Sequence, residues 1–361
     1  MPERTGDFEW RAEGEGAEVL LYAADGSAVE DVLPATRLPG VENPIYAAAS
    51  IPNLGWVAAS TTHAAPALVS APARGLLIST NMFPDDLDVP EEEIVPLLLR
   101  NLSEVSLPRL DGSGVRRICE AGAWAAAEDG FIEEDDLPFF HRAAGDPDSL
   151  GRRALSAGER EWDVLTKVRA CVVEEVLDSL AAENLDLPRG SLVLEVESGA
   201  GDLCRLALAT HEQRILSRIR AGLDLGAEDD LPAAPLGSEE AADTLAAAYA
   251  GANFADGRCA RTLYALRRAL ADATGGLRAV ASWEVGGFEE FGSSALHRRG
   301  LARTNSGAVL VSGDSVAAGT GAMLQSAPPF EAAEVEGVWP WEEAGLLGRL
   351  ATLKDLEPRN G

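Results

Sequence analysis

One long alanine-rich segment restricts most strongly how this chain can fold. It has a helical pattern of small apolar residues from Glu239 to about Thr274, follows Ser238 as a candidate N-cap, and stops before Gly275-Gly276. Shorter helical patterns cover Arg116 to Asp129 and Leu203 to Ala221. The sequence therefore predicts three main helices, of which the third is long.

Short apolar stretches lie between and around these helices. Each is bounded by Gly, Pro or Asp, which is typical of strands; they are Val19 to Tyr22, Leu76 to Ser79, Leu192 to Val196 and Val309 to Val311. Segments 226–238 and 325–343 are rich in Pro, Gly and acidic residues and predict surface loops. With 361 residues, 46% of them apolar, the chain can bury a large core, and the mixed order predicts an α+β fold.

The charge of the chain argues against binding to polyanions. Only 30 basic residues stand against 59 acidic ones, which gives a formal net charge of −29. Affinity for nucleic acid depends on Lys and Arg that neutralise phosphates, so we expect weak RNA binding or none. No apolar run approaches the roughly 20 residues that a membrane span needs, and the acidic start does not resemble a signal peptide. We therefore expect a cytoplasmic protein with no membrane contact.

The four cysteines are Cys119, Cys171, Cys204 and Cys259. They lie far apart and lack the paired spacing of a zinc knuckle or a disulfide framework. Free cysteine is among the most buried residue types, so the sequence predicts four buried thiols.

Several short segments, in the same order along the chain, resemble landmarks of the RtcB-type RNA ligases. They are LPGVENPIYAA (38–48), VSAPARGLLIST (69–80), LVLEVESGAGDL (192–203), AAAYAGANFADGR (246–258) and LHRRGLAR (296–303). Members of that family join RNA ends with manganese and a guanylylated histidine. The resemblance, which covers 38–350, implies an RtcB-like fold of mixed sheets surrounded by helices. It also implies a single domain over 1–361, to which the strand and loop segment 1–37 belongs.

The chain departs from the family at the positions that carry catalysis. The family's metal-binding aspartate and cysteine correspond here to Ala71 and Arg74, and its histidines correspond to other residue types. The positions that the resemblance implies should converge in one degenerate cleft without metal are Glu42, Ala71, Arg74, Cys171, Glu197 and Ser282. The C-terminal segment that carries the guanylylated histidine has only WEEAGLLGR (341–349) as a counterpart, which contains no histidine.

Three hypotheses about function follow. The first is a pseudoenzyme without catalytic residues or cofactor, which acts by binding, for example to a protein partner or a true ligase. The second is an active RNA ligase for 3′-phosphate and 5′-hydroxyl ends, with a site for Mn²⁺ and GTP rebuilt from Glu42, Cys171 and Glu197, since carboxylate and thiolate both bind metals. The third is an unrelated small-molecule enzyme that uses the same cleft.

Three further features have two interpretations each. His297, Arg298 and Arg299 are candidate anion-binding residues, because two guanidinium groups can hold a phosphate by bidentate hydrogen bonds; they could instead pair with surface acids. The turn ESGAGD (197–202) precedes a helix and could bind an anion, although Asp202 is more consistent with a helix cap. Trp339-Pro340-Trp341 predicts either closure of the core or a partner contact.

Overall fold

The computed structural model describes the chain in several stretches, with gaps between them. The described residues are 2–5, 9–22, 26–41, 44–50, 53–66, 69, 71–87, 89–176, 179, 182–183, 186–225, 231–271, 276–304, 309–311 and 351–355. Glu42, segment 325–343 with Trp339-Pro340-Trp341, and segment 341–349 lie outside them.

Within these residues, twelve strands form one mixed sheet. Its order is β1-β2-β3-β4-β5-β12-β11-β7-β9-β8-β14, with β13 paired to β12, while β6 and β10 form a separate two-stranded ladder. The strands are β1 (Glu3–Arg4), β2 (Glu9–Glu13), β3 (Glu18–Tyr22), β4 (Ile45–Ser50), β5 (Asn53–Thr61), β6 (His63–Ala64), β7 (Ala73–Met82), β8 (Lys167–Val176), β9 (Leu192–Ser198), β10 (Ala234–Pro235), β11 (Arg278–Phe291), β12 (Ser294–Thr304), β13 (Val309–Val311) and β14 (Ala351–Asp355). All four predicted strands are present, and the prediction of an α+β fold is confirmed.

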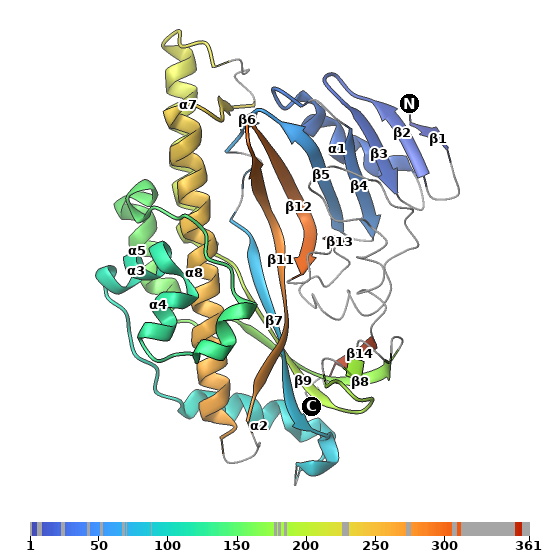
Figure 1. Ribbon diagram of the computed structural model, residues 1–361, viewed down its shortest axis with the longest axis vertical. Helices are drawn as coiled ribbons and strands as arrows, with labels where there is room; N and C mark the ends of the chain where they lie inside the picture. The colour runs from blue at the N-terminus through green and yellow to red at the C-terminus, as the bar shows by residue number, and fades with distance from the viewer. Residues whose placement is uncertain are drawn as a thin grey trace.

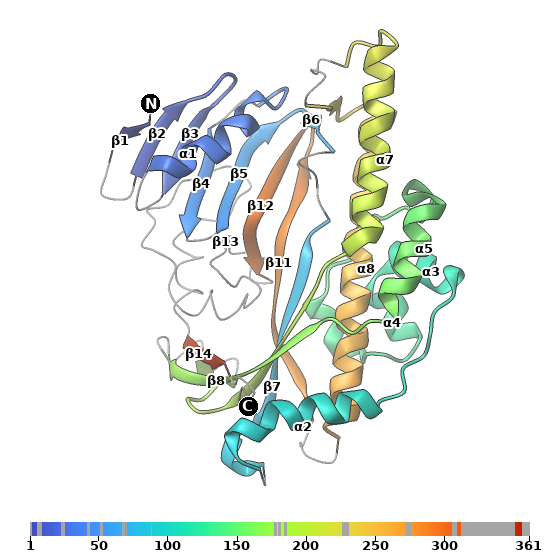
Figure 2. The same cartoon turned by 180° about the vertical axis from the view of Figure 1, so that it is seen from behind.

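The helices differ widely in length. The α-helices are α1 (Val29–Val32), α2 (Glu91–Glu104), α3 (Gly112–Ala121), α4 (Ala123–Glu128), α5 (Gly151–Trp162), α7 (Gly201–Arg220) and α8 (Glu239–Ala269). Short 3₁₀ helices are η1 (Gly26–Ala28), η2 (Leu33–Arg37), η3 (Pro84–Asp86), η4 (Glu134–Phe139) and η5 (Pro147–Leu150). Figures 1 and 2 show α3, α4, α5, α7 and α8 on one side of the sheet, with α2 across the lower end of α8.

Helix α8 begins where the sequence predicts. The Ser238 hydroxyl accepts a hydrogen bond from the backbone N–H of Ala241 at 3.2 Å, which satisfies one of the free donors of the first turn. The helix ends at Ala269, five residues before the predicted end. Its small residues let neighbours approach closely: a Cβ at Gly251 would lie 2.8 Å from the Ala71 Cβ. The alanine-rich composition therefore allows α8 to pack against β7, β9, α3 and α7 at once.

The prediction of one continuous helix from Arg116 to Asp129 is wrong, because the structure has two helices there, α3 and α4. Gly122 separates α3 from α4 with a φ of +58°, a conformation that residues with a side chain rarely adopt. A Cβ there would also lie 3.2 Å from Asn253 Oδ1 on α8. The break lets both short helices follow the surface of α8.

Strands β7 and β9 are neighbours in the interior of the sheet, between β11 and β8. Successive residues Leu76, Leu77 and Ile78 are all buried, so both faces of β7 are covered. A strand buried on both faces appears in the sequence as an unbroken apolar run, as it does here. The N-terminal strands β1 to β3 extend the sheet through a parallel pairing of β3 with β4, and Val29 and Val32 of α1 pack against them in a small core of their own.

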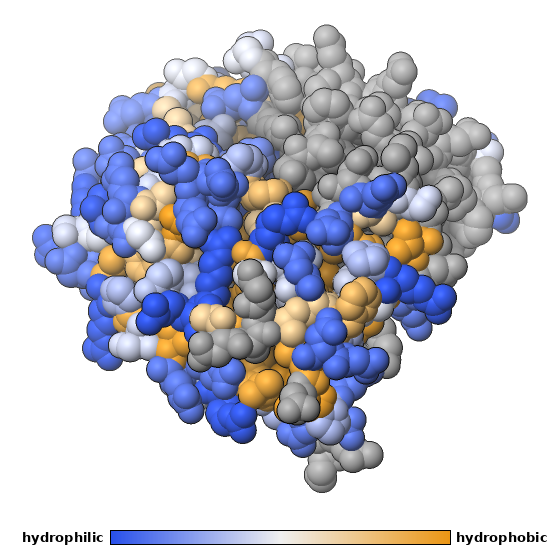
Figure 3. Space-filling view, turned by 60° about the horizontal axis from the view of Figure 1, so that its bottom comes forward, coloured by the Kyte–Doolittle hydropathy of each residue, from blue (hydrophilic) through white to orange (hydrophobic). Residues whose placement is uncertain are grey.

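In the described part of the chain, no helix has both the length and the apolar composition needed to cross a bilayer. Figure 3 shows the end of the molecule that carries α2, where hydrophilic side chains dominate the described surface and hydrophobic ones form small groups between them.

Candidate functional site

Arg74 and Ser282 lie on the same face of the sheet. The antiparallel register pairs Arg74 with Glu284 and Leu76 with Ser282. Because every second residue of a strand points to the same face, the side chains of Arg74, Glu284 and Ser282 all point to the face that α8 covers. Both positions border a small space that Asp256 and Cys259 of α8 close from the other side. Its volume is about 10 Å³, which is about the minimum for a single water molecule. This position is therefore packed and offers no room for a larger ligand.

Glu197 and Cys171 lie on the opposite face. Glu197 pairs with Gly75, the residue after Arg74, so its side chain points to the other face of the sheet. Glu197 also pairs with Lys167 of β8, and Cys171, four residues further along β8, points to the same face as Lys167. Burial raises the pKa of Glu197, and the charges of Lys167 and Arg169 partly oppose that shift. The five described positions therefore do not form one cleft as predicted, because the sheet separates these two residues from Arg74 and Ser282.

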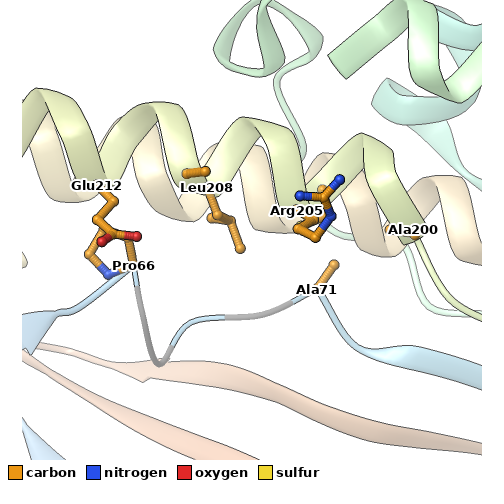
Figure 4. Close-up of a pocket in the computed structure, with 9 residues that line it drawn as sticks. Pro66, Ala71, Ala200, Arg205, Leu208 and Glu212 are labelled. Carbon is orange, nitrogen blue, oxygen red and sulfur yellow. The ribbon is translucent and has the colours of Figure 1, made fainter. Parts of the chain in front are cut away.

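Ala71 lines a different pocket, a groove along the first half of α7. Figure 4 shows Ala71 and Pro66 facing Arg205, Leu208 and Glu212 on that helix. The lining is largely apolar, and its buried thiol, Cys204, has a pKa raised by burial. The groove offers small hydrophobic contacts and one arginine at its edge.

Four charged residues form a buried cluster between the sheet and α8. Arg74 forms an ion pair with Glu284 of β11, and its Nε lies 3.2 Å from Oδ1 of Asp256 on α8. Arg298 of β12 pairs with the other oxygen of Glu284. All four side chains are close to fully buried. A buried charge is costly unless it is paired, so the cluster holds two strands and the helix in a fixed relation.

Burial also affects the ionisation of Asp256, the member of this cluster that lies on α8. Desolvation raises its pKa from 3.8 to about 6, although the Arg74 charge and a hydrogen bond from the backbone of His141 both favour the carboxylate. The cluster can therefore change its charge in the mildly acidic range.

A larger cleft lies next to the cluster. Its volume is about 450 Å³, within the range of small-molecule sites. Apolar lining comes from Tyr249 and Phe288, whose ring centroids are 4.8 Å apart, and from Ala252. The remaining lining residues are mostly polar: Arg74, His141, Arg142, Glu284, Glu290 and Arg298, with Pro72 and Ala143. Glu290 accepts a hydrogen bond from the Tyr249 hydroxyl at 3.3 Å.

Arg298 has the least satisfied side chain in this cleft. It is only 1% exposed, and one of its nitrogens, Nη2, donates to Glu284. Its Nε and Nη1 have no hydrogen-bond partner among the residues that the structure describes. Burial lowers the pKa of Arg298 to about 10, which still leaves it charged at neutral pH. The side chain therefore presents a buried positive charge with donors to spare.

The two neighbours of Arg298 are placed differently. His297 is fully buried, with Nε2 3.3 Å from the carbonyl oxygen of His63, and burial lowers its pKa to about 4. Arg299 belongs to β12 opposite Trp56, and its side chain lies outside the described atoms. Of the three predicted anion-binding residues, the structure places Arg298 in the cleft and His297 away from it.

The helix start at 197–202 already has an anion. The backbone N–H groups of Asp202 and Leu203 donate to the Glu161 carboxylate of α5, at 2.7 and 3.3 Å. Asp202 instead accepts from Arg205 at 2.6 Å. The prediction that Asp202 caps this helix is therefore wrong, and the chain itself supplies the carboxylate for the N-terminus of α7.

All four cysteines are free and buried, as predicted. Over the described ranges, His, Cys, Asp and Glu side chains do not gather in groups of three or more that could hold a metal ion.

The sequence patterns missed several lining residues of the cleft, including Tyr249, His141 and Glu284. One signal was available in α8, where Asn253 and Asp256 interrupt a run of small apolar residues and are both buried. Asn253 fixes the edge of the cleft, because its side-chain amide donates to the carbonyl of Ala143 and accepts from the N–H of Ala143, each at 3.0 Å.

Comparison with known proteins adds no relative to this description. No protein-family model matches the chain, and no curated protein matches it.

Proposed function

We propose that this chain is an RtcB-like protein that has lost ligase catalysis and acts by binding. The observation that carries the proposal is the buried ion pairing of Arg74. The resemblance puts a metal-binding cysteine at this position, and here a guanidinium lies between the carboxylates of Asp256 and Glu284.

This arrangement is incompatible with a bound cation at the same place. A guanidinium has no lone pair to give to a metal and stays protonated at neutral pH. The two carboxylates that would suit manganese already compensate Arg74, and Glu284 also compensates Arg298. A divalent ion would have to displace Arg74 and leave its charge buried without a partner.

The distribution of histidines supports the same proposal. No histidine occurs between Gly300 and Gly361, where the family carries the one that receives GMP. His297 is the nearest histidine before this stretch, and it is fully buried on β12. Its imidazole is therefore not exposed to a nucleotide that approaches from solvent.

Two assays on the purified protein test the proposal. Elemental analysis is expected to find manganese well below one ion per chain, and incubation with labelled GTP and Mn²⁺ is expected to leave no label on the denatured protein. Stoichiometric manganese together with a denaturation-resistant adduct would contradict the proposal and favour the active RNA ligase. Mapping such an adduct to His297 would identify a relocated nucleophile.

We also propose a reducing compartment, the cytoplasm, as the place where the protein acts. Four buried thiols remain unpaired in the folded chain, which is typical of intracellular proteins. Fractionation of cells with an antibody to the protein tests this, and recovery with secreted or membrane fractions would contradict it.

A further inference from the structure

We infer that the cleft between α8, β11 and β12 binds a small molecule that carries an oxyanion group, carboxylate or phosphate, next to a ring. The inference deepens the proposed binding function, on which it rests in part, by naming the ligand class. It starts from Arg298, which lines the cleft and is nine-tenths buried or more.

The hydrogen-bond capacity of Arg298 exceeds what the described part of the chain supplies. A guanidinium has five N–H donors, and here the described partner is one oxygen of Glu284. Nε and Nη1 belong to a side chain that lines the cleft, are buried, and lack acceptors among the described residues. Donors left in this state normally find a partner in a protein or its ligand. An oxyanion with two or three acceptor oxygens supplies what these nitrogens lack.

Charge in the cleft also favours an anion at this end. Glu284 is shared by Arg74 and Arg298, so the two guanidinium groups meet one carboxylate on the cleft side of the cluster. Asp256 contacts Arg74 from the side of α8 and does not line the cleft. Arg142 adds a third, exposed cation at the rim, and Glu290, also exposed, is held by the Tyr249 hydroxyl.

The aromatic part of the lining suits the rest of such a molecule. Tyr249 and Phe288 form a tilted ring pair, and Ala252 leaves space beside them. Aromatic rings prefer offset or tilted contacts with one another, so a ring in this space gains both stacking and burial. A volume of about 450 Å³ holds a single ring with one oxyanion group and excludes a folded macromolecule.

Titration of the full chain with three matched probes tests the inference. Benzoate and phenyl phosphate carry the two kinds of oxyanion on the same ring, and benzamide has the shape of benzoate without its charge. Calorimetry is expected to show one-to-one binding of at least one oxyanion and binding of benzamide at least about tenfold weaker, since hydrogen bonds to charged groups are the stronger ones. Preference between benzoate and phenyl phosphate distinguishes a carboxylate ligand from a phosphate ligand.

Two variants connect the binding to this cleft. Arg298→Lys keeps the charge that Glu284 needs and removes the donors Nε and Nη1, so the favoured oxyanion is expected to bind about tenfold or more weakly. Arg261→Lys is the matched control, because Arg261 is also buried but lies against Trp162, 5.5 Å from its ring, and does not line the cleft. Circular dichroism checks that both variants fold.

If Arg298→Lys does not fold, Ala252→Leu replaces it, since Ala252 lines the cleft and a larger side chain there reduces the space for a ligand. Binding that is unaffected by the variant that folds, equal binding of benzamide, or no binding of either oxyanion overturns the inference. These outcomes are distinct from those of the metal and GTP assays, so the ligand class can fail while the loss of catalysis stands.

Discussion

Arg74 of β7 and Asp256 of α8 meet inside the protein, with Nε 3.2 Å from Oδ1 and both side chains less than 10% exposed. They are 182 positions apart in the sequence, and their contact ties β7 to the long helix that covers it. Because the cleft begins next to this pair, its shape depends on the pair remaining intact.

Removing Arg74 is expected to destabilise the fold strongly. Arg74→Met keeps most of the side-chain volume but leaves Asp256 and one oxygen of Glu284 buried without a compensating charge. Breaking a buried pair in this way costs about 3–5 kcal/mol in free energy of unfolding. Arg109→Met is the control, because that side chain is 87% exposed and its nearest acid is 4.0 Å away. Its cost should stay below about 0.5 kcal/mol in urea unfolding.

The pH dependence of stability should contain a contribution from Asp256. Its pKa is about 6 in the folded protein and near 3.8 when unfolded, so the folded state binds the proton more tightly. The stabilising contribution of this proton is fully present below pH 3.8 and is lost as the pH rises through about 6. Asp256→Asn does not titrate. The wild type is therefore expected to lose stability relative to the variant between about pH 4 and 6.5.

Urea unfolding of the wild type and Asp256→Asn at several pH values measures this difference in free energy of unfolding. The contributions of the other acids are common to both proteins and cancel in the difference. A wild type that gains stability relative to Asp256→Asn over the same interval would show that Arg74 holds the carboxylate charged in the folded state.

The start of α7 gives a third test. Glu161→Ala removes the carboxylate that accepts from the backbone N–H groups of Asp202 and Leu203, and loss of such a cap costs about 1 kcal/mol. Asp202→Ala removes an exposed ion pair with Arg205, which is worth a few tenths of a kcal/mol. A larger loss for Asp202→Ala than for Glu161→Ala in thermal or urea unfolding would reverse the assignment of the cap.

The sequence predicted those parts of the fold that local patterns encode. Helix α8 with its Ser238 cap and the four strands follow from periodicity and capping, which act between near neighbours. The break at Gly122 was missed because it depends on contact with Asn253, 131 positions away. The cap from Glu161 was missed for the same reason, since it comes from another helix.

The candidate site was harder to predict than the fold. A segment-by-segment resemblance places residues along the chain but does not say to which face of a strand each side chain points. A difference of one residue in register separates Glu197 from Arg74 across the sheet. Arg298 was identified because two arginines precede a glycine, whereas Tyr249 and Glu284 carry no comparable local signal. Their importance arises from tertiary contacts.

The last prediction concerns RNA, for which charge decides the outcome. Affinity for a polyanion requires several unpaired Lys or Arg on one face. Many exposed arginines in the described structure are already paired with acids, including Arg117 with Asp129 and Arg214 with Glu239, and the net charge of −29 repels phosphates. The structure thus leaves few cations for phosphate contacts.

We therefore expect single-stranded RNA to bind no more tightly than about 10⁻⁴ M at physiological salt, the weak end of nonspecific affinity. Fluorescence polarisation with a labelled oligonucleotide measures this. Arg298→Lys should not change the result, because a buried side chain in a cleft of this size does not reach an RNA backbone. Submicromolar binding that falls steeply with added salt, and that is lost in Arg298→Lys, would instead show that the cleft opens to RNA and would favour the ligase alternative.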